Sequence, residues 1–462
     1  MSIFRKKSIK TVHDVSEHSK LERRLGAMDL LLMGIGAVVG TGIFVLTGVQ
    51  AATAAGPAVM VSFMLGGLTC IFVALVYTEI ASSVPSAGGA YTFSYISLGE
   101  IVAWLVGWMS IVQLCLGATT VAAGWSGYMM GILAQADIYL PHAFVNIPSK
   151  GGIIDLPACF ICLVVTAVLI RGIKESVKFN AILVVVKLVA IFIFLIVAAP
   201  HFKLENWSNF TPFGIEGVAV AAGAIFMAYT GFDAVANATE ESKNPEKDVT
   251  FGLIGSLLVC IVLYVLVSGM LTGIVPYTQL NNTEPLAYAL KANGSQIGGA
   301  LVAAGGIAGM TTVILFQVYA QSRIFMAMAR DGLLPKFFSK IHSKYHTPYI
   351  CTIIIGVSMS IVAGFLPIAI MGNMASMGTL IVFLVVSVSA LVLRKSKPDI
   401  KRPFKCPAIN LVTALAVLSC GYLIYSLLDS VGIYMLIWIV LGLIVYFVYS
   451  KNNVTKYNFY KT

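Results

Sequence analysis

The chain has 462 residues, of which 58% are hydrophobic and only 11% are charged, and its mean hydropathy is +0.91. Soluble domains carry about 25% charged residues, so this composition excludes a soluble globular protein and indicates a polytopic membrane protein. The formal net charge of +10 does not indicate a nucleic-acid partner, because the basic residues lie in loops between apolar segments, as membrane topology requires.

Twelve apolar segments follow a polar, basic N-terminal tail at residues 1–26. A membrane-spanning helix needs about 20 apolar residues, and the third and eighth segments are long enough to tilt steeply or to extend beyond the bilayer. The twelve segments are 27–50, 57–82, 97–132, 152–171, 179–200, 214–237, 252–276, 297–329, 349–367, 370–394, 408–428 and 431–450.

The distribution of lysine and arginine predicts the orientation of these segments. With the N-terminus in the cytosol, 26 such residues fall in the tails and loops on the cytosolic side, three fall in the outer loops, and Lys187 lies within the fifth segment. Basic loops stay on the cytosolic side of a membrane. We therefore expect an integral protein of the cell membrane with both termini in the cytosol, including a C-terminal tail at 451–462.

Glycines interrupt the first and sixth segments at matching places. The first contains Gly-Thr-Gly at 40–42, and the sixth contains Tyr-Thr-Gly-Phe-Asp at 229–233. Each glycine in a helix costs about 1 kcal/mol relative to alanine, and backbone that opens inside a bilayer must line a cavity. Paired interruptions of this kind indicate an inverted repeat with a binding site near the midplane. We expect a transport core at 27–394, made of segments one to five and six to ten, followed by a cytosolic loop and two appended spans at 395–450.

Four motifs occur in an order that resembles a known family. They are Gly-Ala-Val-Val-Gly-Thr-Gly-Ile-Phe at 36–44, Pro-Ser-Ala-Gly-Gly-Ala-Tyr at 85–91, Phe-Met-Ala-Tyr-Thr-Gly-Phe-Asp at 226–233 and Arg-Asp-Gly-Leu-Leu-Pro at 330–335. They resemble the amino acid–polyamine–organocation superfamily, and within it the bacterial branch of the cationic amino acid transporter family. The resemblance implies an all-α integral membrane protein of twelve transmembrane helices, with the LeuT-type 5+5 inverted repeat and helices 1 and 6 broken at the midplane. It also implies a protein that moves amino acids, often in symport with protons.

The opened backbone of the two interrupted segments is our candidate substrate site. The free N–H groups at the start of a half-helix carry partial positive charge and suit a carboxylate, and Gly40, Thr41 and Gly42 are small enough to let one approach. Freed carbonyl groups near Val38, and near three residues of the sixth segment, would bind an α-ammonium group; these three are Met227, Ala228 and Thr230. Close helix packing through glycines is the alternative. It accounts for Gly36 and Gly40 but leaves the matching interruption in the sixth segment unexplained.

Lys187 lies about nine residues, or roughly 13 Å, into the fifth segment. A lysine at such depth costs about 2.5–3.5 kcal/mol on insertion scales and is functional by default, and snorkelling to an interface is difficult from there. Burial penalises its charged form, so such a group can load and release a proton as its cavity opens and closes. By resemblance to proton-coupled relatives, Lys187 takes the place of a sodium ion and reaches Gly36 and a hydroxyl group of Thr311 or Thr312. We expect Lys187 to couple transport to protons, without sodium dependence.

The acidic residues near the ends of the segments are assigned smaller roles. Glu79 ends the second segment and is expected to make a packing or gate contact. Asp233 follows the interruption in the sixth segment, where it would cap or orient the second half-helix or carry protons. Glu240 and Glu241 are expected to face solvent.

The selectivity of the site depends on where the substrate side chain points. By resemblance this region includes Phe226, Met227 and Gln317. A buried glutamine needs a polar partner, which a polar substrate can supply; a hydrogen bond between helices is the alternative. Since no acidic residue is clearly placed to bind a cationic side chain, cationic substrates are permitted and not required.

The sequence therefore predicts a secondary active amino acid transporter that takes up its substrate with protons by alternating access. No paired carboxylates, nucleophile–base set or metal-ligand cluster stands at the midplane, so we expect no catalytic residues, no metal and no cofactor apart from the proton. Cys159 and Cys162 have C-x-x-C spacing but lie in an apolar helix. The expected partners are a small amino acid and the lipid bilayer, with no nucleic acid; no accessory subunit is indicated.

Two alternatives remain open at this point. One is an amino acid exchanger, or a carrier of a polyamine or another small polar metabolite on the same fold. The other is a membrane sensor that binds an amino acid without moving it. A sensor would normally add a soluble output domain, whereas only short tails flank the apolar segments.

Overall fold

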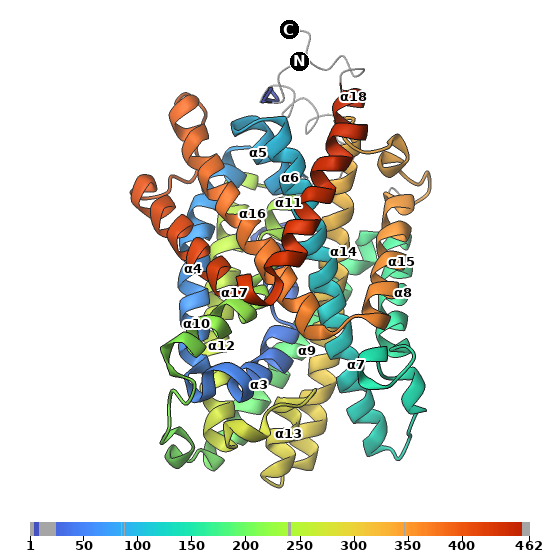
Figure 1. Cartoon of the computed structure of the whole chain (residues 1–462), viewed down its shortest axis with the longest axis vertical. Coiled ribbons are helices and arrows are strands. Elements are labelled where there is room, and N and C mark those ends of the chain that lie inside the picture. Colours follow the sequence, from blue (N-terminus) through green and yellow to red (C-terminus); the bar gives the residue numbers. More distant parts are fainter. Residues whose placement is uncertain are drawn as a thin grey trace.

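The structure is a computed structural model of the chain, and it describes residues 4–8, 25–84, 86, 88–238, 242–345 and 347–454. Apart from two isolated β-bridges, these residues form helices and the loops between them. Many of the long helices run along the long axis of the molecule (Figure 1). Glu240 and Glu241, expected to face solvent, lie outside the described residues.

The helices have the following bounds. The α-helices are α2 (Ala27–Val38), α3 (Thr47–Gln50), α4 (Val59–Ser83), α5 (Gly89–Ser97), α6 (Glu100–Ser110), α7 (Gly117–Gln135), α8 (Leu156–Arg171), α9 (Ile173–Ala198), α10 (Gly214–Ala224), α11 (Ala234–Asn237), α12 (Pro245–Ile274), α13 (Pro285–Ala292), α14 (Gln296–Arg330), α15 (Tyr349–Phe365), α16 (Ile368–Ser396), α17 (Ile409–Val445) and α18 (Lys451–Val454). Short π- or 3₁₀-helical turns adjoin several of them, among which are η1 (Gly42–Leu46), η2 (Ala51–Ala55), η4 (Ile111–Leu116), η9 (Ile225–Tyr229) and η13 (Tyr446–Ser450).

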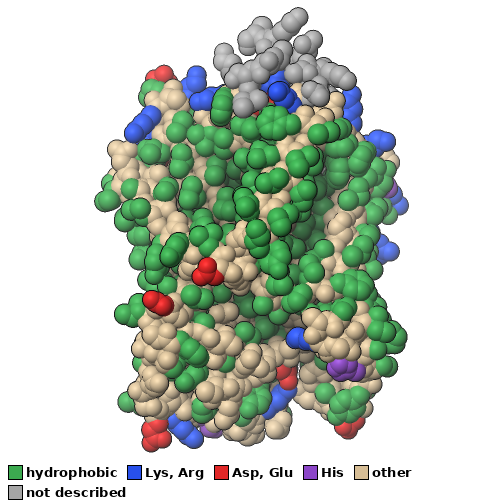
Figure 2. All heavy atoms as spheres, viewed as in Figure 1, with side chains coloured by type: hydrophobic (Ala, Val, Ile, Leu, Met, Phe, Trp, Pro, Cys, Tyr) green, Lys and Arg blue, Asp and Glu red, His purple; other side chains and the backbone are tan. Residues whose placement is uncertain are grey.

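Seven helical stretches within the described ranges are long and apolar enough to cross a membrane, and four shorter apolar helices accompany them. The seven stretches are Gly42–Ser83, Glu100–Gln135, Ala181–His201, Glu246–Ile274, Gln296–Arg330, Ile368–Ser396 and Ile409–Ser450. Hydrophobic side chains cover much of the middle of the face in Figure 2, whereas more of the basic side chains lie towards the end that carries α18. These features indicate a multi-pass integral membrane protein.

The first apolar segment is interrupted one residue before its Gly-Thr-Gly run. Helix α2 ends at Val38, and Val39 is extended, with φ −75° and ψ 100°. The helical path resumes around Thr41 and continues as the π-helical turn η1. The interruption therefore separates α2 from the rest of this apolar segment.

The sixth apolar segment is interrupted as well, but over a longer distance. Helix α10 tightens into the 3₁₀ turn η9, after which Thr230 is extended with ψ 134°. Gly231 then has a φ of +124°, which only glycine adopts without strain. The short helix α11 follows, so the segment consists of two helical parts joined by irregular backbone.

The last two apolar segments adjoin each other without a loop between them. The expectation was a helix at 408–428 and another at 431–450, and helical backbone covers both, from Ile409 to Val445, as α17. The chain nevertheless reverses direction: in Figure 1 the ribbon of α17 descends from the end of α16 and then rises towards α18.

Packing around the first interruption determines where its neighbours lie. Helix α9 packs against both α14 and α2, and α12 packs against α2 and α4. The residues near the interruption are therefore surrounded by helices that come from widely separated parts of the chain. Polar side chains on α9, α12 and α14 can reach the backbone that α2 leaves unpaired where it ends.

Candidate functional site

The side chain of Lys187 on α9 is fully buried and ends at the interruption of the first segment. Its ammonium group donates to the carbonyl oxygens of Ile35 at 3.1 Å, Gly36 at 2.9 Å and Val39 at 2.9 Å. The hydroxyl oxygen of Thr312 on α14 lies 3.2 Å away as a fourth acceptor. An ammonium group has three N–H donors and no acceptor, so this set of oxygens suits the charged form of the lysine.

The two adjacent threonines of α14 have different partners. The hydroxyl of Thr312 contacts the Lys187 ammonium and donates to the Gly36 carbonyl oxygen at 2.9 Å. The hydroxyl of Thr311 instead donates to the Ile307 carbonyl and accepts from the indole N–H of Trp125. Of the two threonines that the resemblance offered as partners, Thr312 therefore contacts the lysine.

The interrupted helices meet each other directly. A Cβ built on Gly42 would lie 2.2 Å from the Cβ of Ala228, and a Cβ built on Gly231 would lie 2.6 Å from the carbonyl oxygen of Ala37. Neither position has room for a side chain. Glycine is therefore required at both positions for the two backbones to approach this closely.

A tyrosine that the sequence did not single out bridges the two interruptions. The hydroxyl of Tyr264 on α12 lies 2.9 Å from the carbonyl oxygen of Val38 and 2.8 Å from that of Ala228. A phenol carries one proton, so it donates to only one of these carbonyls at a time. Val38 and Ala228 are two of the four positions predicted to offer carbonyls to an α-ammonium group. In this structure the Tyr264 hydroxyl contacts both.

The other predicted residues of the sixth segment bond to α16. The backbone N–H of Met227 donates to the hydroxyl of Ser376 at 3.0 Å, and the hydroxyl groups of Thr230 and Thr379 lie 3.0 Å apart. The ring of Phe226 packs edge-on against another ring of α16, that of Phe383. Helix α16 thus holds the backbone on one side of the second interruption.

Helix α7 lies beside the first interruption. The hydroxyl of Thr41 points to the carbonyl oxygen of Val121 at 3.5 Å, and Gln317 on α14 lies against the Cα of Gly117. Gln317 is buried, and its amide oxygen has no hydrogen-bond partner among the described residues. It is therefore an acceptor that a ligand N–H group can use. Gly40 lies against Val313, also on α14.

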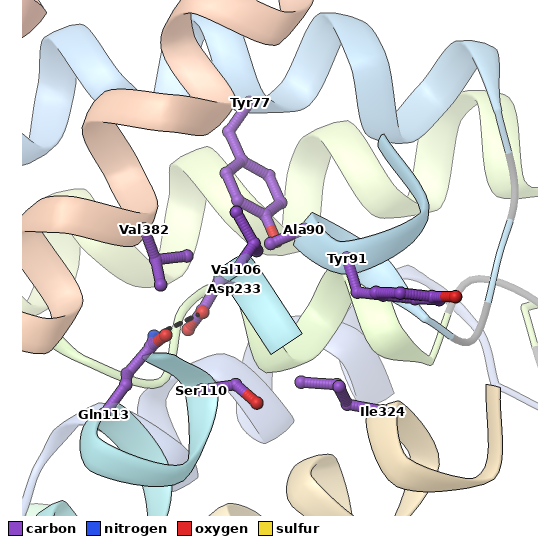
Figure 3. A pocket seen from close by; sticks show the side chains of 9 residues that line it. All are labelled: Tyr77, Ala90, Tyr91, Val106, Ser110, Gln113, Asp233, Ile324 and Val382. Atoms are coloured by element: carbon purple, nitrogen blue, oxygen red, sulfur yellow. Dashed lines mark hydrogen bonds between the residues drawn. The ribbon is translucent and has the colours of Figure 1, made fainter. Parts of the chain in front are cut away.

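Asp233 lies beside a small cavity on the α11 side of the second interruption (Figure 3). One carboxylate oxygen accepts from the side-chain amide of Gln113 at 2.8 Å and the other accepts from the Gly231 N–H at 3.1 Å. The cavity has a volume of about 10 Å³, room for about one water molecule, and Tyr77 and Tyr91 also line it. The contact with Gly231 ties the carboxylate to the irregular backbone of the interruption.

Glu79 lies apart from this region, at the end of α4. Its buried carboxylate contacts the Nε atoms of Arg394 at 3.3 Å and Arg402 at 3.4 Å, and it accepts from the backbone N–H of Cys406 at 2.7 Å. It joins α4 to the connection between α16 and α17. No candidate metal site was found in the described part of the chain, because no three His, Cys, Asp or Glu side chains there are placed to hold an ion.

Three residues in these contacts carried a sequence signal that was not used. Gln113, Tyr264 and Ser376 are polar residues well inside apolar segments, and a buried hydroxyl or amide must find a partner. That rule identifies residues that bond to something, but it does not name the partner. The contacts of Tyr264 with two separate interruptions follow only from where the packing of α12 against α2 places this side chain.

Comparisons with known proteins identify the family of the chain. The family model described as amino acid permease matches residues 25–462. The methylthioribose transporter of Bacillus subtilis (strain 168) is 43% identical over 454 residues, which is 98% of each chain. The branched-chain amino acid permease BcaP of the same organism is 43% identical over 458 residues, again 98% of each chain. The vacuolar cationic amino acid transporter 4 of Arabidopsis thaliana is 37% identical over 410 residues, 86% of this chain and 68% of the relative. With matches that run along nearly its whole length, the chain belongs to the amino acid permease family of the amino acid–polyamine–organocation superfamily.

Proposed function

We propose that this protein is a proton-coupled symporter that carries an amino acid into the cell by alternating access. Membership of the permease family supports the transport of an amino acid or another small metabolite. The observation that carries the proposal of proton coupling is the contact between the buried Lys187 ammonium and three backbone carbonyls at the first interruption. An ionisable group inside the membrane that contacts the candidate site can link its protonation to the state of that site.

In the proposed binding step, a zwitterionic substrate enters between the two interruptions. Its carboxylate faces the N–H groups at the start of the helical turn that follows Gly40, where the helix dipole is positive. Its ammonium group takes the carbonyl oxygens of Val38 and Ala228, which share the single hydroxyl proton of Tyr264 in this structure. Gln317 offers its unpaired amide oxygen to the substrate side chain. Phe226 and Met227 belong to the same proposed region.

The coupling step follows from the donors and acceptors of Lys187. When protonated, the lysine holds α2 to α9, and Thr312 extends this contact to α14. A neutral amine has one donor fewer and directs a lone pair at the remaining carbonyl oxygen, so the contact weakens. Loss of the proton then frees α2 to move with its bound substrate. Proton release and substrate release would thus occur from the same conformation.

The proposed architecture has twelve membrane crossings in the LeuT-type arrangement, with both termini in the cytosol. The two interrupted helices occur in the first and sixth apolar segments, as an inverted repeat of five-helix units requires. The reversal of α17 supplies the eleventh and twelfth crossings. The surplus of lysine and arginine on one side supports the orientation in the cell membrane.

Transport by purified protein in liposomes tests this proposal. Uptake of labelled leucine, lysine and methylthioribose should be measured at fixed concentration, with and without an inward proton gradient, for the wild-type protein and Lys187→Ala. We expect the gradient to increase uptake of one substrate by the wild-type protein, and Lys187→Ala to lose that uptake. Lys291→Ala is the matched control, because Lys291 forms a partly exposed ion pair with Glu284 outside the site. Uptake that ignores the gradient while Lys187→Ala stays active would reject proton coupling.

The same experiment separates the alternative functions. An exchanger would show counterflow but no accumulation driven by the gradient. A sensor would be stabilised by its ligand against thermal unfolding without moving it. A carrier of a thiosugar is the second candidate, since a relative with 43% identity is named a methylthioribose transporter. That sugar has no carboxylate or ammonium group, so its uptake would be insensitive to competing amino acids.

A further inference from the structure

The connection between α16 and α17 is the most basic short stretch of the described chain outside the candidate site. Together with the last turn of α16, this connection spans residues 394–405, which contain six lysines and arginines and a single acidic residue, Asp399. Two acidic residues from other helices form ion pairs with this stretch, namely Glu79 on α4 and Glu246 on α12. The connection therefore keeps a net positive charge beside the ends of two membrane helices.

Glu79 gives this connection a defined shape. Its carboxylate contacts the Nε atoms of Arg394 and Arg402. Arg402 uses its remaining donors on backbone carbonyl groups of the connection, including those of Pro398 at 2.8 Å and Lys397 at 2.6 Å. Arg394 donates from one terminal nitrogen to the Cys406 carbonyl at 3.1 Å. These bonds fold the connection around the two arginines.

The folded connection borders an open cavity of about 520 Å³ at the surface. Six described residues line it, and four of them are basic while none is acidic; they are Arg394, Pro398, Ile400, Lys401, Arg402 and Lys405. The side chains of Lys401 and Lys405 are exposed and thus free to reorient. Lys401 contacts Glu246 at 2.6 Å, but both partners are substantially exposed, so water and salt screen this pair.

From this cavity we infer a binding site for the phosphate group of an anionic phospholipid in the adjacent leaflet. Arginine and lysine are the side chains that bind phosphate, through charge and multiple N–H donors. Basic clusters next to the end of a membrane helix attract anionic headgroups. The cavity has the volume for a phosphate with its glycerol headgroup, and Pro398 and Ile400 supply an apolar part of the wall.

The surroundings favour a lipid over a soluble anion. Helix α17 begins at Ile409, four residues after Lys405, and carries exposed apolar side chains at helical spacing, namely Leu411, Leu415 and Leu418. Such a stripe faces acyl chains in a membrane protein. A headgroup in the cavity would therefore belong to a lipid whose tails lie beside this helix.

The simpler explanation is that the six cations serve only to keep this loop on the cytosolic side. That role depends on how many charges the loop has and not on where each one lies. The two explanations therefore differ for lysines that share the loop. Lys401 and Lys405 line the cavity, whereas Lys395 and Lys397 are exposed residues of the same stretch that do not line it.

The test measures lipid binding by the purified full-length protein. Wild type, Lys401→Gln/Lys405→Gln and the control Lys395→Gln/Lys397→Gln are titrated in detergent, at physiological salt, with phosphatidylglycerol or phosphatidylcholine, and bound lipid is counted by native mass spectrometry. We expect wild type to prefer phosphatidylglycerol. The cavity variant should lose about fivefold in affinity for each lysine, or roughly 25-fold in all, whereas the control should change little because salt screens distant charges. All three proteins should unfold at the same temperature without lipid, since the substituted side chains are exposed.

Three outcomes would overturn the inference. Equal loss of affinity in the two double variants would show that only the charge of the loop matters. If inorganic phosphate at millimolar concentration stabilised wild type as much as phosphatidylglycerol does, the ligand would be a soluble anion and not a lipid. Retention of the preference for phosphatidylglycerol by the cavity variant would place the lipid elsewhere on the protein.

Discussion

Gly42 and Ala228 touch where the two interrupted helices meet, so closely that a Cβ on residue 42 would lie 2.7 Å from the Cα of Ala228. Gly42→Ala should push the helices apart. We expect a loss of about 1–3 kcal/mol in the free energy of unfolding and a fall in uptake of about tenfold, because an overpacked core cannot relax without moving backbone. Thermal unfolding and uptake into liposomes measure the two effects.

Gly421→Ala is the control for this substitution, because no atom lies within 4 Å of a Cβ built on Gly421. It should transport like wild type. Adding Ala228→Gly to Gly42→Ala removes one of the two clashing methyl groups and should restore part of the uptake. A double variant no better than Gly42→Ala would show that the defect arises from another contact.

Tyr264→Phe should affect stability and substrate affinity in opposite directions. Without the hydroxyl, the buried carbonyls of Val38 and Ala228 lose a donor, and an unpaired buried acceptor costs about 1–3 kcal/mol. A substrate ammonium would no longer compete with the hydroxyl for these carbonyls, so the substrate concentration for half-maximal uptake should fall. Tyr422→Phe, on an exposed side chain of α17, should change neither quantity. A higher half-maximal concentration would show that the hydroxyl itself binds the substrate.

Thr312→Val should weaken proton coupling more than Thr311→Val does. Both changes replace a hydroxyl by a methyl group of similar size, but only Thr312 contacts the Lys187 ammonium and the Gly36 carbonyl. A hydrogen bond to a charged group contributes about 1.5–3 kcal/mol. We therefore expect the ratio of uptake with and without a proton gradient to fall in Thr312→Val. It should stay near the wild-type value in Thr311→Val, and an equal fall in both variants would contradict the assigned contact.

Gln317→Leu should alter which substrates are preferred without destabilising the protein. The substitution removes a buried amide oxygen that lacks a partner among the described residues, and removing such an acceptor costs little. Uptake measured in competition with a panel of amino acids should shift towards apolar side chains. Gln321→Leu is the control, since Gln321 lies one turn further along α14, where its amide oxygen also lacks a partner among the described residues but its amide N–H donates to Ser110. An unchanged ranking in Gln317→Leu would place the substrate side chain elsewhere.

Glycine content predicted the region of each interruption but not the peptide at which it begins. The first helix ends at Val38, before any residue of the Gly-Thr-Gly run. The Gly36 carbonyl loses its helical partner there, and this explains why it bonds to Lys187, whereas the Ile35 carbonyl accepts from the Val39 N–H at 3.0 Å as well as from the lysine. The helix end is determined by these tertiary partners, which local composition does not encode.

Hydropathy similarly predicted the length of a helix but not which of its residues face a given neighbour. The segment predicted at 297–329 differs by one residue at each end from α14, but whether Thr311 or Thr312 faces α9 depends on a rotation of about 100° per residue. The reversal within α17 illustrates the same limit, since an apolar count marks two crossings without showing that no loop separates them.

The position of Lys187 in the chain has a consequence for biosynthesis. Its three carbonyl acceptors belong to residues about 150 positions earlier, so they are already in the bilayer when the lysine leaves the ribosome. The helix bearing Thr312 does not yet exist at that stage. A nascent chain that ends before α14 can therefore shelter the charge that would otherwise oppose insertion of α9, and substitutions that straighten the end of α2 should impair assembly before they can impair transport.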